Sequence, residues 1–349
     1  MANSIEIDGR RIGPDYEPYV ICELSANHNG DLDRALELMT AAAATGADAI
    51  KLQSYTPDTI TIDHDGPGFV IEGGLWHGRR LYDLYKEAQT PFEWHEALFA
   101  HARKLGVTLF STPFDESAAD LLADLGAPAF KIASFEAIDL PLIAHVARKG
   151  KPMIISTGMS NLGEINDAVR TARDNGCDEL VLLHCVSSYP APDEQSNVRT
   201  VPHLAEAFGV VGGLSDHTAG SAVSVASVAL GGSVIEKHFT LRRADGGPDS
   251  AFSLEPDEFT ALVTDCKRAW RALGRVGYDL QGCERGSTAF RRSIYVVRDV
   301  PAGATLDASN IRSIRPGYGL APRHLPDVLG QRAARDLKRG QPLAWDAIA

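Results

Sequence analysis

The sequence lacks long apolar segments and paired cysteines. No run of about 18 uncharged apolar residues occurs in it, and the opening stretch MANSIEIDGRRIGPDY has no apolar segment of signal-peptide length. None of the five cysteines lies in a CxxC pair. These absences predict a protein of the reducing cytoplasm that neither spans a membrane nor is exported by a recognisable route.

Basic residues are also in short supply. The chain has 34 Lys and Arg against 46 Asp and Glu, which gives a formal net charge of -12. A protein that holds nucleic acid through a general basic surface needs clustered Lys and Arg against the phosphates. The charge balance argues against that class, so any anion must be bound at a local site.

The length and apolar content are sufficient for a substantial core. A chain of 349 residues with 44% hydrophobic content predicts one large domain and one small one. Charged residues make up 23% and aromatic residues 7%, which is ordinary for a soluble globular protein and indicates no disordered scaffold.

Short apolar runs that end in polar residues alternate with segments of helical apolar spacing. Eight runs read as strands: YVICELSANH, AIKLQSYT, TLFSTPFDE, AFKIASFE, PMIISTG, ELVLLHCVSSYP, VGGLSDHT and VIEKHFT. Several of the helical segments end in a Gly that commonly terminates a helix. Eight such units over roughly 270 residues predict an α/β fold, a (β/α)8 TIM barrel, whereas a doubly wound sheet more often has five or six strands.

The second and third strands are separated by about 50 residues, which is too long for one crossover. The Gly-rich beginning of this segment predicts a loop over the barrel mouth, followed by the expected helix. The alternative is a solvated excursion without a role.

After about residue 275 the pattern changes to short β-like runs with turns. A quasi-repeat is visible there, because Arg298, Asp299, Gly303, Leu306 and Ile311 recur at identical spacing as Arg335, Asp336, Gly340, Leu343 and Ile348. We therefore predict a barrel domain over residues 1–275, a linker over 276–289 and a small β-rich module over 290–349 that docks on something.

Polar residues at the carboxyl ends of barrel strands share one mouth and are catalytic candidates. The strand ends supply Glu23, Asn27, His28, Lys51, Gln53, Ser111, Thr112, Lys131, Ser134, Glu136, Ser156, His184, Ser187, Ser215, Asp216, His217, Glu236 and His238. Lys51 and Lys131 follow apolar β runs, and burying an unpaired ammonium is costly. A bound anion explains them, and the alternative is an ion pair with Glu23 or Glu136.

Four serines strengthen the prediction of an anion site. Ser134, Ser156, Ser187 and Ser215 end four separate strands. Their hydroxyls donate hydrogen bonds without adding charge, which suits a phosphate or a carboxylate held by convergent donors.

Two histidines end consecutive strands, His217 in LSDHT and His238 in IEKHF. Two imidazoles with several exchangeable positions suit a divalent cation acting as a Lewis acid, Mn²⁺, Mg²⁺ or Co²⁺, better than structural zinc. The alternative for each histidine is a hydrogen-bonded core residue. Each is accompanied by an acid, Asp216 or Glu236.

These motifs, taken together and in order, resemble the sialic acid synthase family, which includes synthases of N-acetylneuraminic, legionaminic and pseudaminic acids. The resemblance covers nearly the whole chain and is carried by CELSANHNGD, GADAIKLQSYTPDTIT, FSTPFD, FKIASFE, ISTGMS, LLHCVSSYPAP, GLSDHT, GGSVIEKHFT and GGPDSAFSLEPDEF. The tail from Phe290 is similar to the antifreeze-like (SAF, β-clip) domain that follows the family's barrel. LWHGRRLYDLYKEAQTPFEWH and SANHN are most similar to the pseudaminic acid synthases.

The resemblance implies a transferase that joins phosphoenolpyruvate to an open-chain amino sugar, here 2,4-diacetamido-2,4,6-trideoxy-altrose, with release of phosphate by C–O cleavage. It implies that Lys51 and Thr112 hold the carboxylate of phosphoenolpyruvate, and that Lys131, Ser134, Ser156, Ser187 and Ser215 hold its phosphate. Some family members have Asn in place of Ser187. His217 and His238 would bind the cation, with Glu136 among the substrate-binding residues.

Further roles follow from the same resemblance. Glu23 is the candidate for orienting or deprotonating a water, and Glu236 would lie behind the residues that contact this water and the cation. Gln53, Tyr189 and Asp249 match sugar-contacting positions. Arg315 matches a residue that a partner subunit inserts over the substrate, which implies a domain-swapped homodimer. The alternatives are an N-acetylneuraminate or legionaminate synthase, and more remotely a non-catalytic sugar-binding or ice-binding protein.

Overall fold

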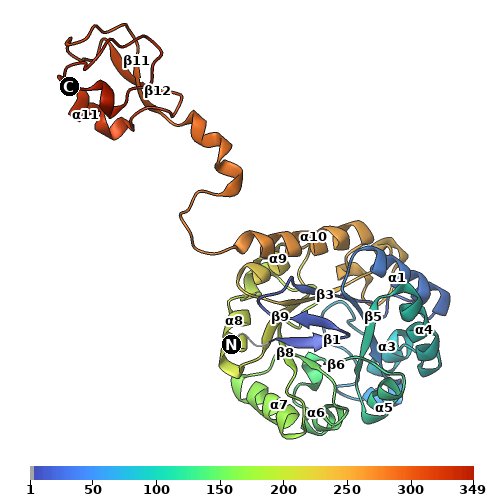
Figure 1. The fold of residues 1–349 in the computed structure, drawn as a ribbon. Coiled ribbons are helices and arrows are strands. Elements are labelled where there is room, and N and C mark those ends of the chain that lie inside the picture. The colour runs from blue at the N-terminus through green and yellow to red at the C-terminus, as the bar shows by residue number, and fades with distance from the viewer. Residues whose placement is uncertain (1–3) are drawn as a thin grey trace. The chain divides into compact units, whose positions relative to one another are not determined.

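The computed structural model describes residues 4–349, which form two compact units that meet in sequence between Gly274 and Arg275 (Figure 1). The first unit contains the barrel, and we call the second, residues 275–349, the tail module. No helix within residues 4–349 has both the length and the apolar character needed to cross a bilayer.

Eight parallel strands close into a barrel, which confirms the predicted fold class. In sequence order they are β3 (Tyr19–Glu23), β4 (Ala49–Ser54), β5 (Thr108–Pro113), β6 (Phe130–Ile132), β7 (Met153–Ser156), β8 (Leu180–Cys185), β9 (Val211–Asp216) and β10 (Val234–His238). β10 pairs with β3 to complete the ring. The register places Glu23 beside both Lys51 and His238, so residues far apart in sequence share one end of the barrel.

A ring of helices covers the outside of the strands (Figure 1). The main ones are α1 (Leu32–Ala44), α4 (His95–Leu105), α5 (Glu116–Asp124), α6 (Leu140–Ala147), α7 (Leu162–Asp174), α8 (Thr200–Phe208), α9 (Ala222–Ala229) and α10 (Pro256–Leu273). Their starts follow ordinary capping rules, since the carboxylate of Asp115 accepts from two backbone N–H groups of α5 and Asn161 forms a capping box with Glu164 at α7. Their apolar faces join the outward side chains of the strands in one core.

A short hairpin that the sequence analysis missed precedes the barrel. β1 (Ile5–Ile7) pairs with β2 (Arg10–Ile12) through a turn at Asp8 and Gly9, whose φ angles are 51° and 77°. Ile5, Ile7 and Ile12 pack with inward-facing barrel residues such as Tyr19 and Phe110. The hairpin therefore belongs to the core at the amino-terminal end of the strands. An Asp-Gly pair flanked by alternating apolar residues was the available signal.

The segment between β4 and β5 forms the predicted loop over the barrel mouth. It contains α2 (Pro57–Ile60), then a hairpin-like excursion over residues 69–81 that we call the tongue, and then α3 (Leu81–Ala88) before α4. A bridge between Val70 and Arg80 and the bond from Ile71 N to Arg79 O hold its two sides together. Gly73 and Gly74 turn its tip at φ angles of 81° and 70°, which favour glycine.

The tail module has its own small core around β11 (Ser293–Val296), β12 (Ile311–Ile314) and α11 (Leu325–Val328). The quasi-repeat, with its offset of 37 positions, becomes a pseudo-twofold arrangement of backbone bonds. Val300 and Leu337 donate to each other's carbonyls at 2.9 and 2.8 Å. The bond from Gly303 N to Ala333 O has its equivalent from Gly340 N to Val296 O.

Candidate active site

The carboxyl ends of the strands surround a cavity of about 480 Å³, within the range of small-molecule sites. All the predicted site residues except Ser187 and Arg315 line it: Glu23, Lys51, Gln53, Thr112, Lys131, Ser134, Glu136, Ser156, Tyr189, Ser215, His217, Glu236, His238 and Asp249. The barrel topology thus gathers side chains that the sequence places on eight separate strands and their loops.

Strand alternation decides which polar residues face this cavity. Lys51 and Gln53 point inward from β4, and Ser54 points outward, where its Oγ lies 2.6 Å from Nε2 of His95 on α4. Ser111 was a predicted strand-end candidate, but its Oγ lies 2.7 Å from that of Ser54 on the outer side. We therefore remove Ser111 from the candidate set.

Two lysines and two glutamates form a buried charged cluster in the cavity. Lys51 pairs with Glu23, and its Nζ lies 3.7 Å from Oε1 of Glu236. Lys131 Nζ lies 3.5 Å from the same Glu236 oxygen. Lys51 Nζ also donates to Thr112 Oγ1 at 3.1 Å. The ion-pair alternative is therefore realised for Lys51 with Glu23, whereas Lys131 has Glu236 as its partner and not Glu136.

Burial and these neighbours shift the ionisation of the cluster in different directions. Burial raises the pKa of Glu23, and it lowers the pKa of Lys131. Burial opposes the charged form of Lys51 too, but Glu23 and Glu236 outweigh it and raise the pKa of Lys51. Burial likewise opposes the charged form of Glu236, but Lys131 and Lys51 outweigh it and hold the pKa of Glu236 below its usual range. The two lysines and the two glutamates therefore balance in formal charge, and burial opposes the charged form of all four groups.

Hydroxyl groups surround the Lys131 side of the cavity. Ser156 Oγ is buried and has no hydrogen-bond partner, and Ser215 Oγ donates to Glu236 at 3.3 Å. Ser134 begins a short 3-10 turn and accepts from Gly158 N at 3.1 Å. Ser187 does not line the cavity itself, but its Oγ lies near Gly158, as does the Oγ of Ser134. A Cβ added to Gly158 would lie 2.3 Å from the first oxygen and 2.7 Å from the second. A side chain at position 158 would therefore require both hydroxyls to move.

Glu136 is a second acidic group near Lys131. Its Oε2 is buried without a hydrogen-bond partner. Burial raises the pKa of Glu136 to about 7, although the Lys131 ammonium acts in the opposite direction. The carboxyl group therefore changes its charge near neutral pH.

The two histidines lie next to each other in the wall of the cavity, with ring centroids 5.3 Å apart. His217 Nδ1 lies 3.0 Å from the carbonyl of Val186, which can only accept, so that nitrogen carries a proton, and in the neutral ring Nε2 keeps its lone pair. Burial opposes the charged form of His217, but Cys185, the Val186 carbonyl and Glu236 outweigh it and raise the pKa of His217. His238 Nδ1 is buried without a hydrogen-bond partner, and burial lowers the pKa of that ring, which keeps it neutral. Within residues 4–349 no three His, Cys, Asp or Glu side chains gather as metal ligands.

The acids that accompany the histidines have different positions. Glu236 lines the cavity, but Asp216 points outward and forms a fully buried ion pair with Lys237, 3.0 Å from Oδ2 to Nζ. Lys237 Nζ also donates to Thr218 O at 2.6 Å. Asp216 immediately precedes His217, and Lys237 immediately precedes His238. The ion pair therefore joins the ends of β9 and β10 on the outer side of the barrel wall.

A hydrogen-bonded network orients Glu23. Its Oε1 accepts from Ser25 N at 2.8 Å and from Gln53 Nε2 at 3.2 Å. The Ser25 hydroxyl also bonds to the carboxylate of Asp249, in the segment after β10. Burial raises the pKa of Asp249. Ser25 has no signal in the sequence beyond its place after a strand, and it was not predicted.

Sequence reasoning also missed the apolar wall of the cavity. It consists of Tyr55, Ile60, Ile71, Trp76, Leu81, Leu84, Tyr85, Ala88 and Phe114, and Cys185 lines the floor. Most of these residues come from the segment between β4 and β5. Their positions in the wall depend on how the loop folds back, which spacing alone does not give.

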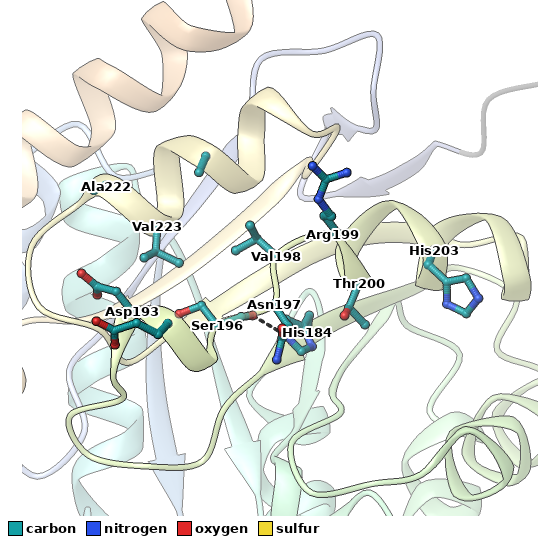
Figure 2. Close-up of a pocket in the computed structure, with 12 residues that line it drawn as sticks. His184, Asp193, Ser196, Asn197, Val198, Arg199, Thr200, His203, Ala222 and Val223 are labelled. Carbon is teal, nitrogen blue, oxygen red and sulfur yellow. Dashed lines mark hydrogen bonds between the residues drawn. The ribbon is translucent and has the colours of Figure 1, made fainter.

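Three further strand-end candidates lie outside this cavity. Asn27 Nδ2 donates to Phe239 O and to Ser253 Oγ, and His28 accepts from Gly30 N and packs on Trp94. Both act as structural residues. His184 points out of the barrel into a second, open hollow, where its Nε2 bonds to Ser196 O at 2.7 Å (Figure 2).

Arg315 lies directly after β12 in the tail module and is exposed. Its predicted action over a substrate stays a prediction.

Comparisons with known proteins agree with the architecture. Residues 38–278 match the model of the NeuB family, and residues 291–349 match the SAF domain. The chain is 43% identical to the pseudaminic acid synthase of Helicobacter pylori over 95% of this chain and 98% of that protein. It is 36% identical to the N,N'-diacetyllegionaminic acid synthase of Legionella pneumophila, over 100% and 99% of the two chains.

A solved structure is similar as well. The crystal structure of N-acetylneuraminic acid synthetase from Leptospira borgpetersenii in complex with citrate superposes with a TM-score of 0.73 at 30% identity, covering 82% of this chain and 95% of that one. The fold and the family model therefore agree.

Proposed function

Because the chain belongs to the NeuB family, we propose that it condenses phosphoenolpyruvate with 2,4-diacetamido-2,4,6-trideoxy-altrose to give pseudaminic acid and phosphate. The observation that carries this choice is the near full-length similarity to pseudaminic acid synthases, 43% and 41% identical in two organisms, against 36% for the legionaminic acid synthase.

The phosphoenolpyruvate site consists of the two lysines and the hydroxyl groups. Lys51 and Thr112 bind the carboxylate, and their 3.1 Å contact places both donors together. Lys131 binds the phosphate together with Ser134, Ser156, Ser187 and Ser215, and all of these except Ser187 line the same cavity as Lys131. The unpartnered buried Oγ of Ser156 supports this role, because such a hydroxyl is costly unless a ligand accepts its proton.

A divalent cation, Mn²⁺ first and Mg²⁺ or Co²⁺ as alternatives, fits beside the histidines. His238 has an unpartnered Nδ1 in a ring held neutral, which is the state that ligation requires. His217 has its Nδ1 on the Val186 carbonyl, and a cation at Nε2 would displace the second proton that its raised pKa favours. A bound cation would polarise the sugar aldehyde as a Lewis acid. Two protein ligands leave the remaining positions to the substrate and water.

The reaction balances with one water. C3 of phosphoenolpyruvate bonds to the aldehyde carbon, and water adds at C2. The C2–O bond to phosphate then breaks and leaves the C2 ketone, so one proton of the water ends on the former aldehyde oxygen and the other leaves with phosphate. Glu23 accepts the proton of that water, because Ser25 and Gln53 fix its carboxylate and burial raises its pKa toward the range of a general base. Glu236 lies between the two lysines and balances their charge while the phosphate departs.

The sugar occupies the outer half of the cavity. Gln53, Tyr189 and Asp249 contact it. Tyr189 supports this position because its ring lies 4.4 Å from that of His217, where the aldehyde would bind.

The tail module acts on the barrel of a second copy, in a domain-swapped homodimer of the cytoplasm. Residues 275–349 contain 12 Lys and Arg and seven Asp and Glu, against 22 and 39 in residues 1–274, so the two parts carry net charges of +5 and -17. α10 ends where Trp270 and Arg271 bond to Pro14 and Glu17, which precede the first barrel strand. The chain therefore leaves the barrel at the end opposite the cavity, which favours delivery of Arg315 to another copy.

Product analysis tests the proposed function. The purified protein is incubated with phosphoenolpyruvate, Mn²⁺ and one of three sugars: the diacetamido altrose, its legionaminic-type epimer, or N-acetylmannosamine. Mass spectrometry of the product should show pseudaminic acid at the highest rate with the first sugar. A faster reaction with another sugar would reassign the enzyme within the family, and no product with any sugar would favour the non-catalytic alternative.

A further inference from the structure

The cavity has two chemically different walls. The floor carries the charged cluster, the serines and the histidines, whereas the side under the segment between β4 and β5 is apolar. Three residues of that apolar wall, Ile71, Trp76 and Leu81, belong to the tongue. All three are half-buried, while Leu75, their neighbour in the tongue, is 49% exposed. The tongue therefore has an apolar underside and a solvated outer side.

Trp76 joins the tongue to the opposite rim of the barrel. Its Nε1 donates to Pro248 O at 2.9 Å, and its ring centroid lies 5.6 Å from that of Tyr189. Pro248 adjoins Asp249, and Tyr189 follows β8. The indole thus spans the mouth from the β4 side to the β8 and β10 sides, next to two residues that contact the sugar in the proposed function.

We propose that the underside of the tongue determines which sugar the enzyme accepts, by binding the apolar substituents of the sugar, its C6 methyl and its acetamido methyl groups. The inference rests on the proposed condensation and adds residues to it. Ile71, Trp76 and Leu81 supply apolar contact, and the indole N–H, bonded to Pro248 O, fixes the tongue over the cavity.

The chemistry of the two substrates explains this division. Phosphoenolpyruvate carries two anionic groups and has its ligands among the lysines and serines of the floor. A trideoxy sugar with two acyl groups has little hydroxyl surface and several methyl groups, which need an apolar partner. A sugar with a C6 hydroxyl would leave that group without a hydrogen-bond partner against Ile71 or Leu81, and this costs binding.

The expected size of the effect follows from apolar pockets in general. One methyl group in such a pocket changes kcat/KM by about 10- to 200-fold. Replacing Trp76 with Ala, or Leu81 with Asn, should therefore lower kcat/KM for the diacetamido trideoxy sugar by about tenfold or more. KM for phosphoenolpyruvate should change less than about twofold, because the tongue does not contact its site.

The experiment measures discrimination as well as rate. The wild type and the variants Trp76→Ala, Trp76→Phe and Leu81→Asn are assayed with the trideoxy sugar and with its 6-hydroxy counterpart. The ratio of the two kcat/KM values should fall in Trp76→Ala and Leu81→Asn. Trp76→Phe keeps an aromatic face but loses the N–H to Pro248, so it should raise the sugar KM with a smaller change in the ratio. Leu75→Ala is the matched control on the outer side and should behave as the wild type.

Two results would overturn the inference: an unchanged ratio in both Trp76→Ala and Leu81→Asn, or an equal effect of Leu75→Ala. Failure of the proposed function looks different, because the wild type would then condense another amino sugar. The ratio is in that case measured with that sugar and its 6-deoxy counterpart, and a ratio insensitive to Trp76 and Leu81 rejects the tongue as the specificity element.

Discussion

Replacing Lys237 with Met should destabilise the barrel strongly, although this residue touches no part of the cavity. Its ammonium is fully buried, 3.0 Å from Asp216 Oδ2 and 2.6 Å from Thr218 O. Removing one partner of a buried pair costs about 3–5 kcal/mol, because the other charge stays buried without compensation. Asp216 keeps bonds from Thr218 and Ser224, which places the expected loss near the lower end of that range.

Denaturant and thermal unfolding measure this loss. A cost of about 3 kcal/mol corresponds to a fall in Tm of about 5 °C for a domain of this size. Lys149→Met is the matched control, because Lys149 pairs with the half-exposed Asp120, and surface pairs contribute about 0–1 kcal/mol. kcat/KM should also fall in Lys237→Met, since the pair fixes the backbone beside His217 and His238.

A double variant makes the test sharper. Combining Lys237→Met with Asp216→Asn removes both charges, so the double variant should be less destabilised than the sum of the two single variants, by about 0.5–3 kcal/mol. Additive losses, or a single-variant loss no larger than that of Lys149→Met, would refute the view that the buried pair connects the two strand ends.

The remaining predictions concern the cavity and the tail. His217→Ala or His238→Ala should abolish metal-dependent turnover and leave cooperative unfolding intact; full activity in EDTA would reject the metal assignment. Lys131→Ala should raise KM for phosphoenolpyruvate far more than KM for the sugar, and unchanged kinetics would leave Lys131 as the partner of Glu236 alone. The pKa of Glu136 is raised to about 7, so its carboxyl group gains negative charge as the pH rises through that value, and the affinity for phosphoenolpyruvate should fall. Dividing the Kd of Glu136→Gln by the Kd of the wild type cancels the titration of the ligand, and this ratio should decrease between about pH 6 and 8. A constant ratio would contradict the shift. Arg315→Ala mixed with Lys131→Ala should regain activity, up to roughly a quarter of wild type, because random subunit exchange leaves one intact site in each mixed dimer of a swapped pair; a mixture that stays inactive although mass-tagged subunits have exchanged would reject action in trans.

The barrel could be predicted from sequence because its strands are buried on both faces. Such strands appear as apolar runs that stop at a polar residue, and each run is separated from the next by a helix. The hairpin at Asp8 and Gly9 was missed because two strands of three residues give little periodicity. The Asp-Gly turn was the only strong local signal.

The residues of the candidate site could be predicted as a group, but the direction in which each side chain points could not. Residues that end a strand share one end of the barrel, and this places Lys51, Lys131 and His217 together. Whether a given residue faces the cavity depends on the strand period of two, and a shift of one position sends Ser111 and Asp216 outward. Ion-pair partners also depend on how far along the barrel axis each side chain lies. Lys131 therefore pairs with Glu236 on a distant strand and not with Glu136, which is nearby in sequence.

The reciprocal hydrogen bonds of the tail module make its two halves structurally equivalent. Val300 and Leu337 occupy equivalent places in the repeat and bond to each other, and Leu306 N to Gln331 O is matched by Leu343 N to Ile294 O. A single half-module would therefore find every one of these partners in an identical second chain. The two halves are thus related to each other as the two chains of a symmetric dimer are, and the stretch between them acts as the linker.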